Sequence, residues 1–388
     1  MRLVDDLYGK IDHILITYYQ NFQASLAQEL AEKMDSDVVI SVAYPKEQEG
    51  SFGSPPKSID EIRKRHKNVE PFPIDGWHTE WIQDTVHAYE NNTLMHSTPS
   101  KIMEASPDKV LGYTPDPEKG KNILDAPYWD EIGFRIIEND SNFMVVGGEA
   151  IRCGDYAYLG TESWIYFLDE VMLENRKLSK EIKYFQKFGI ETKNIEKIYQ
   201  AFIKHTGYIS GDCNTVLIGP SVNKKIGMHL DLYFHPHENG CFISKSSLYD
   251  ENEKNLPMSD ENCNIEKNLS LLKIKNSREV PIFLKRENGD AVIVEQTGID
   301  GKKMALHVIN KTPFYSPINS LFEIYEKNGE SVRNVYMPHY GKSFEPASNS
   351  AESSFAAEGF HVNRITFPLM DAGGGLRCCT KVLKRRQG

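Results

Sequence analysis

The sequence has few cysteines, no long apolar run and no excess of basic residues, and each shortage excludes a class of protein. Six cysteines in 388 residues are too few for a disulfide scaffold. The longest apolar runs, such as residues 143–146, are far too short to cross a membrane as a helix. With 45 basic against 55 acidic residues, the net charge of −10 argues against non-specific nucleic-acid binding. We therefore expect neither a nucleic-acid nor a membrane partner.

The first residues give an expectation about location. Asp5 and Asp6 fall where a signal peptide needs an uninterrupted apolar stretch, which favours a cytoplasmic protein. Export without a cleaved signal stays open, and the sequence gives no prediction of the oligomeric state.

What the chain has is enough apolar material for a packed core and a recurrence of short strands and helices. The hydrophobic fraction is 40% and the aromatic fraction 11%. Period-2 and period-3.6 patterns predict strands over 13–19, 37–45, 214–220, 227–234 and 361–370, helices over 21–34 and 316–329, a loop over 46–60, and a hairpin over 278–296. This pattern predicts one α/β domain over residues 1–388.

A first polar cluster lies in the segment WIQDTVHAYE. Trp81 and Asp84 would place an aromatic face and a carboxylate together, which suits a planar cation. The alternative is a surface turn in which Asp84 caps a helix.

A second cluster lies in GMHLDLYFHPHENG. His229 and Asp231 are two residues apart, so on a strand both would point to one face. His235 and His237 share that parity, which raises the alternative of a zinc or iron site. Pro236 interrupts the strand between them, and structural histidines satisfied by hydrogen bonds are the other interpretation.

The third cluster, GGGLRCCTK, contains Cys378 and Cys379. Arg377 and Lys381 are cationic neighbours, and such neighbours lower the pKa of a thiol and make it a nucleophile. A phosphate-binding loop is excluded because no GK[ST] follows the glycines. A buried structural cysteine pair or a vicinal disulfide is the alternative.

A fourth cluster, GGEAIRCGD, adds the carboxylates of Glu149 and Asp155. Taken together, two carboxylates (Asp84 and Asp231), an acid and base (His229) and a thiol (Cys378) suit attack on a guanidinium carbon. In that chemistry the carboxylates orient the cation, the thiolate attacks, and the imidazolium protonates the leaving nitrogen.

These motifs, in the order W-x-x-D-T, G-M-H-L-D and G-G-G-x-x-C-x-T-K, resemble those of the pentein superfamily of guanidino-group-modifying enzymes. The superfamily includes arginine, agmatine and peptidylarginine deiminases and the amidinotransferases. The resemblance implies an α/β fold in which five ββαβ units form a propeller-like ring around a central active site. It implies no cofactor and no metal, and a substrate that is a small guanidino compound or a protein arginine side chain.

Residue by residue, the resemblance implies Cys378 as nucleophile, His229 as general acid and base, and Asp84 and Asp231 as guanidinium ligands. Trp81, Arg377 and Glu149 would complete the substrate site.

The segment around Asp84 is most similar to peptidylarginine deiminases, which favours a hydrolase that forms a ureido product through an amidino-thioether. Arg377 stands where the family commonly has His, and Val146 stands where arginine deiminases have an acid. MHLD and the basic end also resemble amidinotransferases. An amidinotransferase, a metal-dependent hydrolase and an inactive binding homologue therefore stay open as alternatives.

Overall fold

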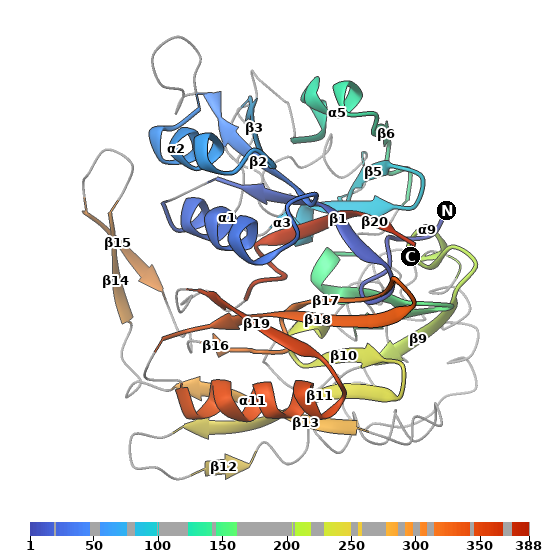
Figure 1. Cartoon of the computed structure of the whole chain (residues 1–388), viewed down its shortest axis with the longest axis vertical. Helices are drawn as coiled ribbons and strands as arrows, with labels where there is room; N and C mark the ends of the chain where they lie inside the picture. Colours follow the sequence, from blue (N-terminus) through green and yellow to red (C-terminus); the bar gives the residue numbers. More distant parts are fainter. Residues whose placement is uncertain are drawn as a thin grey trace, which may run out of the picture.

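The computed structural model describes most of the chain in separate stretches. These are residues 1–18, 21–46, 55–75, 82–98, 100, 123–141, 145–160, 204, 206–218, 229–249, 255–257, 277–285, 292–297, 303–308, 314–341, 345–367 and 375–387. The described part is a mixed α/β structure of several small sheets with few helices (Figure 1).

The first sheet joins the two ends of the described chain. β1 (Lys10–Thr17) lies between β20 (Thr380–Arg386) and β2 (Val39–Pro45), and β3 (Val69–Ile74) follows β2. β20 runs antiparallel to β1, so the red C-terminal strand lies beside the blue N-terminal strand in Figure 1. This pairing anchors the segment that carries Cys378, which lies two residues before β20 begins.

Five sheets share one strand pattern, in which the first strand is antiparallel to the second and the second is parallel to the third. The pattern is β20-β1-β2 in the first sheet. It recurs in β4 (Val86–Tyr89), β5 (Thr93–His96) and β6 (Arg135–Ile137); in β7 (Ala150–Cys153), β8 (Tyr156–Gly160) and β9 (Asn214–Ile218); in β10 (Phe234–His237), β11 (Gly240–Tyr249) and β13 (Ser277–Lys285); and in β17 (Leu321–Lys327), β18 (Glu330–His339) and β19 (His361–Thr366). The α/β class and its small repeated units are confirmed, whereas closure of the units into a propeller stays a prediction.

The remaining elements are shorter or lie beside these sheets. The helices are α1 (Asn21–Lys33), α2 (Lys57–Arg65), α3 (Ile82–Thr85), α5 (Tyr128–Glu131), α9 (Gly207–Ser210) and α11 (Glu345–Ala357), with 3-10 turns η4 (Ile123–Asp125), η5 (Gly147–Glu149) and η6 (Leu230–Leu232). The remaining strands are β12 (Asn255–Pro257), β14 (Val292–Thr297), β15 (Lys303–Val308) and β16 (Phe314–Tyr315). Within the described stretches, no helix has the length and apolar character to cross a membrane.

The expected elements near the N-terminus, at 214–220 and at 361–370 are confirmed by β1, α1, β2, β9 and β19, but four others are wrong. Part of the expected loop 46–60 is helical, because α2 begins at Lys57. The expected helix 316–329 contains β17, which pairs with β18 through a turn at Asn328 and Gly329, both with positive φ. The expected hairpin 278–296 is also wrong, since β13 pairs with β11 and β14 with β15. Within the expected strand 227–234, residues 230–232 form the 3-10 turn η6 instead.

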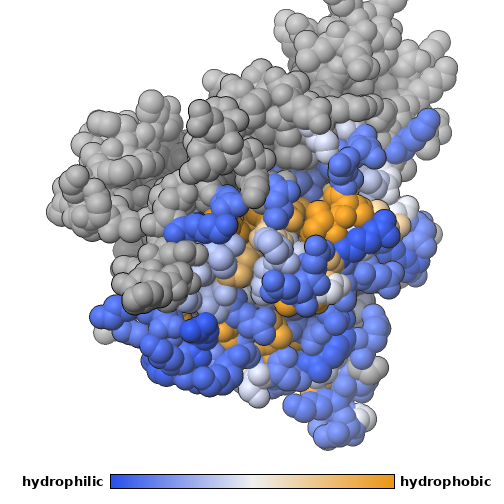
Figure 2. Space-filling view, turned by 90° about the horizontal axis from the view of Figure 1, so that it is seen from above, coloured by the Kyte–Doolittle hydropathy of each residue, from blue (hydrophilic) through white to orange (hydrophobic). Residues whose placement is uncertain are grey.

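Buried apolar side chains fill the spaces between sheets and helices. One cluster packs α1 and α2 against β1 and β2, and a second packs α11 against β11, β17 and β18. Among the described residues, the large hydrophobic side chains that are exposed are those of Met1 and Tyr156. Figure 2 accordingly shows a mainly hydrophilic surface, with hydrophobic residues in small groups between the hydrophilic ones.

Candidate active site

The proposed nucleophile lies on a tight turn at the start of β20. The N–H of Cys379 donates to the carbonyl of Gly375 over 3.3 Å, and the N–H of Thr380 donates to that of Arg377 over 3.2 Å. Cys378 is 3% exposed, and its sulfur lies 3.8 Å from Asp231 Oδ2. The thiol therefore faces a carboxylate that the sequence motif placed in the same site.

Cys379 lies on the other side of the turn, in a different environment. Its side chain is fully buried in the apolar cluster formed by α1, β1 and β2. Neither Cys378 nor Cys379 forms a disulfide within the described residues. Adjacent residues thus face opposite sides, one toward polar groups and one toward the core.

Asp231 reaches the site from η6 and not from a strand. His229 immediately precedes this turn. The two side chains therefore lie on the same side because of the turn and not because of strand alternation. Asp231 is 1% exposed, and its Oδ2 accepts a hydrogen bond from Arg377 Nη1 over 2.7 Å. In the part of the chain that the structure describes, Asp231 Oδ1 has no hydrogen-bond partner.

Arg377 is held between two acidic residues. Its Nε and Nη2 donate to Asp6 Oδ1 over 3.2 and 2.9 Å, and Nη2 also donates to the carbonyl of Ala150 over 3.0 Å. Burial would lower the pKa of Arg377, but Asp6 and Asp231 outweigh it and raise that pKa, so the guanidinium stays charged. Arg377 therefore binds carboxylates of its own chain.

Asp84 and His229 form the more exposed side of the site. Asp84, on α3, accepts a hydrogen bond from the N–H of Gly148 over 3.0 Å, and its Oδ1 lies 3.5 Å from His229 Nδ1. The two side chains are 14% and 28% exposed. A Cβ on Gly148 would lie 2.5 Å from His229 Nδ1, so the Gly-Gly segment is what lets the imidazole approach.

Glu149 contacts the turn that carries Asp231. Its carboxylate is fully buried, and Oε1 accepts a hydrogen bond from the N–H of Leu230 over 3.2 Å. A Cβ on Gly160 would lie 1.7 Å from Glu149 Oε2, so glycine there leaves room for the carboxylate. This contact ties Glu149 to η6, and its expected contact with substrate stays a prediction.

Burial and negative charge surround the thiol. Burial, together with Asp231 and Asp84, raises the pKa of Cys378 well above its usual value. Burial also raises the pKa of Asp231, against the effect of Arg377. The expectation that basic neighbours lower the thiol pKa is therefore wrong, because Arg377 is paired with Asp6 and Asp231.

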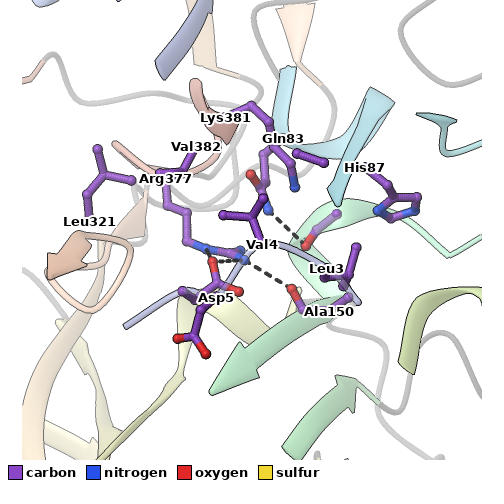
Figure 3. Close-up of a pocket in the computed structure, with 13 residues that line it drawn as sticks. Leu3, Val4, Asp5, Gln83, His87, Ala150, Leu321, Arg377, Lys381 and Val382 are labelled. Atoms are coloured by element: carbon purple, nitrogen blue, oxygen red, sulfur yellow. Dashed lines mark hydrogen bonds and ion pairs between the residues drawn. The ribbon is translucent and has the colours of Figure 1, made fainter. Parts of the chain in front are cut away.

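Figure 3 shows a small polar cavity next to the site. Its volume is about 20 Å³, and Asp6, Gln83, Arg377 and Lys381 contribute polar groups to its lining. Such a volume accommodates about one water molecule and no substrate. Burial and the nearby Arg377 lower the pKa of Lys381 to about 8.

The two further histidines of the alternative metal site pack against aromatic side chains. The His235 ring stacks on Phe322 with centroids 4.0 Å apart, and the His237 ring lies 4.6 Å from that of Phe242. Burial lowers the pKa of His235 to about 3. Among the described residues, no three His, Cys, Asp or Glu side chains are grouped to hold a metal. His235 and His237 are thus core histidines.

Trp81 lies outside the described residues. Asn319, which no sequence motif indicates, is fully buried and donates from Nδ2 to Cys378 Sγ over 3.2 Å. It precedes β17, in the segment expected to be a helix, and no local pattern connects it to a cysteine 59 positions away.

Comparisons with known proteins add little to this geometry. No family model matches the chain, and no curated protein matches it. Among solved structures, the chain is similar to SxtG, an amidinotransferase from Microseira wollei in the saxitoxin biosynthetic pathway, with a TM-score of 0.40 and 9% identity over 100% of this chain and 98% of that one. A TM-score of this size carries no argument about function.

Proposed function

We propose that this chain is a cysteine-dependent enzyme that breaks a C–N bond of a guanidinium group, as a deiminase-like hydrolase in a single pentein-type domain over residues 1–388. The observation that carries the proposal is the approach of Asp231 to the Cys378 sulfur, at 3.8 Å, in a site where Asp84 also faces His229. A thiol next to two carboxylates suits a cationic substrate.

Asp84 and Asp231 are the proposed ligands of the guanidinium. Asp231 Oδ1 is buried and lacks a hydrogen-bond partner within the described residues, so it can accept an N–H from a bound cation. Its Oδ2 is engaged by Arg377, which holds the carboxylate in place. Trp81 would pack against the substrate's planar group.

A cationic substrate would also activate the thiol. The negative charges of Asp231 and Asp84 disfavour the thiolate at Cys378. A bound guanidinium adds a positive charge at the same position, and an opposite charge at short range favours ionisation. The thiol would therefore lose its proton more readily with substrate bound than in the free protein.

The proposed reaction has two steps. The Cys378 thiolate forms an S–C bond to the guanidinium carbon, His229 gives a proton to a nitrogen, and the C–N bond breaks with loss of ammonia. Water, deprotonated by His229, then adds to the amidino-thioether carbon. The S–C bond breaks, and the products are a ureido compound and the free thiol.

An amidinotransferase is the second candidate. In that reaction the first leaving group is the substrate's amine, and an acceptor amine takes the place of water. The observation that favours it is the burial of Cys378 (3% exposed), because a transferase must keep water from the intermediate. The MHLD segment and the basic end of the chain give it further support.

The test is incubation with arginine, agmatine and an arginyl peptide, each with and without added glycine, followed by mass spectrometry and an ammonia assay. A ureido product and ammonia without added amine would support the hydrolase. Turnover that requires the amine and yields a new guanidino compound would show the transferase. The absence of turnover with every substrate would favour an inactive binding homologue.

A further inference from the structure

Asn319 contacts the proposed nucleophile with both ends of its side-chain amide. Oδ1 accepts a hydrogen bond from the Cys378 N–H over 3.0 Å, and Nδ2 lies 3.2 Å from the Cys378 sulfur. Because a backbone N–H only donates, the contact at Oδ1 settles which end of the amide is the oxygen. The donor end therefore faces the sulfur.

The backbone around Asn319 holds this arrangement in place. Its carbonyl accepts a hydrogen bond from the Arg377 N–H over 3.2 Å, and its own N–H donates to the Ser316 carbonyl over 3.2 Å. A Cβ on Gly375 would lie 2.9 Å from Asn319 Cβ and Oδ1, so glycine permits the close approach of the cysteine turn. The amide is thus positioned by both segments before any reaction.

We propose that Asn319 is a catalytic residue that stabilises the Cys378 thiolate by donating a hydrogen bond from Nδ2 to the sulfur. The proposal rests on Cys378 being the nucleophile of the proposed function. When the thiol loses its proton to a base, the same contact becomes a hydrogen bond to an anion, which is roughly twice as strong as one between neutral groups.

The charges around the sulfur explain why a neutral donor suits this site. Asp231 on η6 and Asp84 on α3 disfavour the thiolate, and the Arg377 guanidinium is paired with Asp6 and Asp231. His229 Nδ1 lies 3.5 Å from Asp84 Oδ1. A lysine or arginine at the sulfur would compete with a cationic substrate for the two carboxylates, whereas an amide adds no charge.

The pKa of the thiol is the quantity to measure, because it requires no substrate. The ultraviolet absorbance of the thiolate is followed against pH in each protein, and the same titration of its Cys378→Ser derivative is subtracted. Asn319→Ala should leave a roughly tenfold smaller fraction of thiolate at any pH below the pKa. Asn319→Asp keeps the acceptor for the Cys378 N–H but replaces the donor by a carboxylate, so its effect should be larger.

Ser320→Ala is the matched control. This buried neighbour donates to the Pro317 carbonyl over 2.5 Å, and no contact with the sulfur is described for it. The variant should titrate like the unmodified protein. A thiol pKa that is unchanged in Asn319→Asp would overturn the proposal and leave Asn319 a purely structural role. If the pKa shifts but no guanidino substrate is turned over, the hydrogen bond stands and the proposed function fails.

Discussion

Arg377 Nη1 donates to Asp231 Oδ2 over 2.7 Å, so a guanidinium of the chain itself occupies one oxygen of a carboxylate that the motif assigns to substrate. Nε and Nη2 of the same guanidinium bind Asp6, near the N-terminus. Arg377, which stands where the motif that this sequence resembles commonly has His, is therefore part of a chain of charges, Asp6–Arg377–Asp231. This arrangement fixes Asp231 and leaves its Oδ1 for a ligand.

Removal of Arg377 should destabilise the fold strongly. Arg377→Ala leaves the buried Asp231 and the partly buried Asp6 without this cationic partner, which costs about 3–5 kcal/mol of unfolding free energy. Urea unfolding measures this cost. Arg364→Ala, which removes a more exposed arginine paired with Glu345 and Glu352, should cost under about 1 kcal/mol. Equal losses of unfolding free energy in the two variants would show that the Asp6–Arg377–Asp231 ion pairs stabilise the fold no more than an exposed ion pair does.

Substitution of Cys378 should affect activity, whereas substitution of Cys379 should affect mainly stability. Cys378→Ala should abolish turnover because it removes the nucleophile. Cys379→Ala should keep most of the turnover and lower the unfolding free energy by about 1 kcal/mol, because its buried thiol packs in the core. Steady-state kinetics and urea unfolding measure the two effects. The reverse pattern would show that the motif is shifted by one residue.

Asp84 and Asp231 should each be needed for efficient turnover of the substrate. Asp84→Asn and Asp231→Asn should each lower kcat/KM about a hundredfold or more, since a neutral amide poorly replaces a charge-assisted hydrogen bond to a cation. Asp155→Asn, at a side chain that is 80% exposed, is the control and should change little. Normal kinetics in Asp84→Asn would also remove the main link to peptidylarginine deiminases.

A methyl group on Gly148 should displace the imidazole. The Cβ of Gly148→Ala would lie 2.5 Å from His229 Nδ1, closer than side chains tolerate, so the ring must move away from Asp84. We expect kcat to fall at least about tenfold, as proton transfer by a positioned group contributes more than that. Gly207→Ala adds a Cβ with nothing within 4 Å and should leave kcat unchanged. A normal rate in Gly148→Ala would place His229 outside the reaction.

Acid should destabilise the chain through its buried histidines. Burial lowers the pKa of both His13 and His96 from 6.5 to about 4, so the folded chain binds their protons less readily than the unfolded chain does. Their contribution to stability is therefore complete above about pH 6.5 and is lost as the pH falls through about 4. Urea unfolding across this range should show a smaller loss in His13→Gln than in the exposed control His361→Gln. Identical pH slopes would exclude His13 as a cause.

Local patterns in the sequence were sufficient for part of the fold, and they also named the candidate site residues. β1, α1, β2 and β19 follow from hydrophobic periodicity, because each is long enough for period 2 or 3.6 to be distinct. The segment 316–329 contains a strand where the pattern predicts a helix, because SLFEIYEKNG fits both periods over a short span. Residues 321–327 form a strand because they pair with β18 through the Asn328–Gly329 turn.

The sequence by itself determined which chemical groups are present: a thiol, an imidazole and two carboxylates in motif order. Only the tertiary structure decided what each group contacts. Arg377 contacts Asp6 across 371 positions, and Asn319 contacts Cys378 across 59. Neither contact can therefore be predicted from local spacing in the sequence. The physical reason is that burial places charges and hydrogen-bond partners according to the packing of distant sheets, and this packing sets the pKa of Cys378.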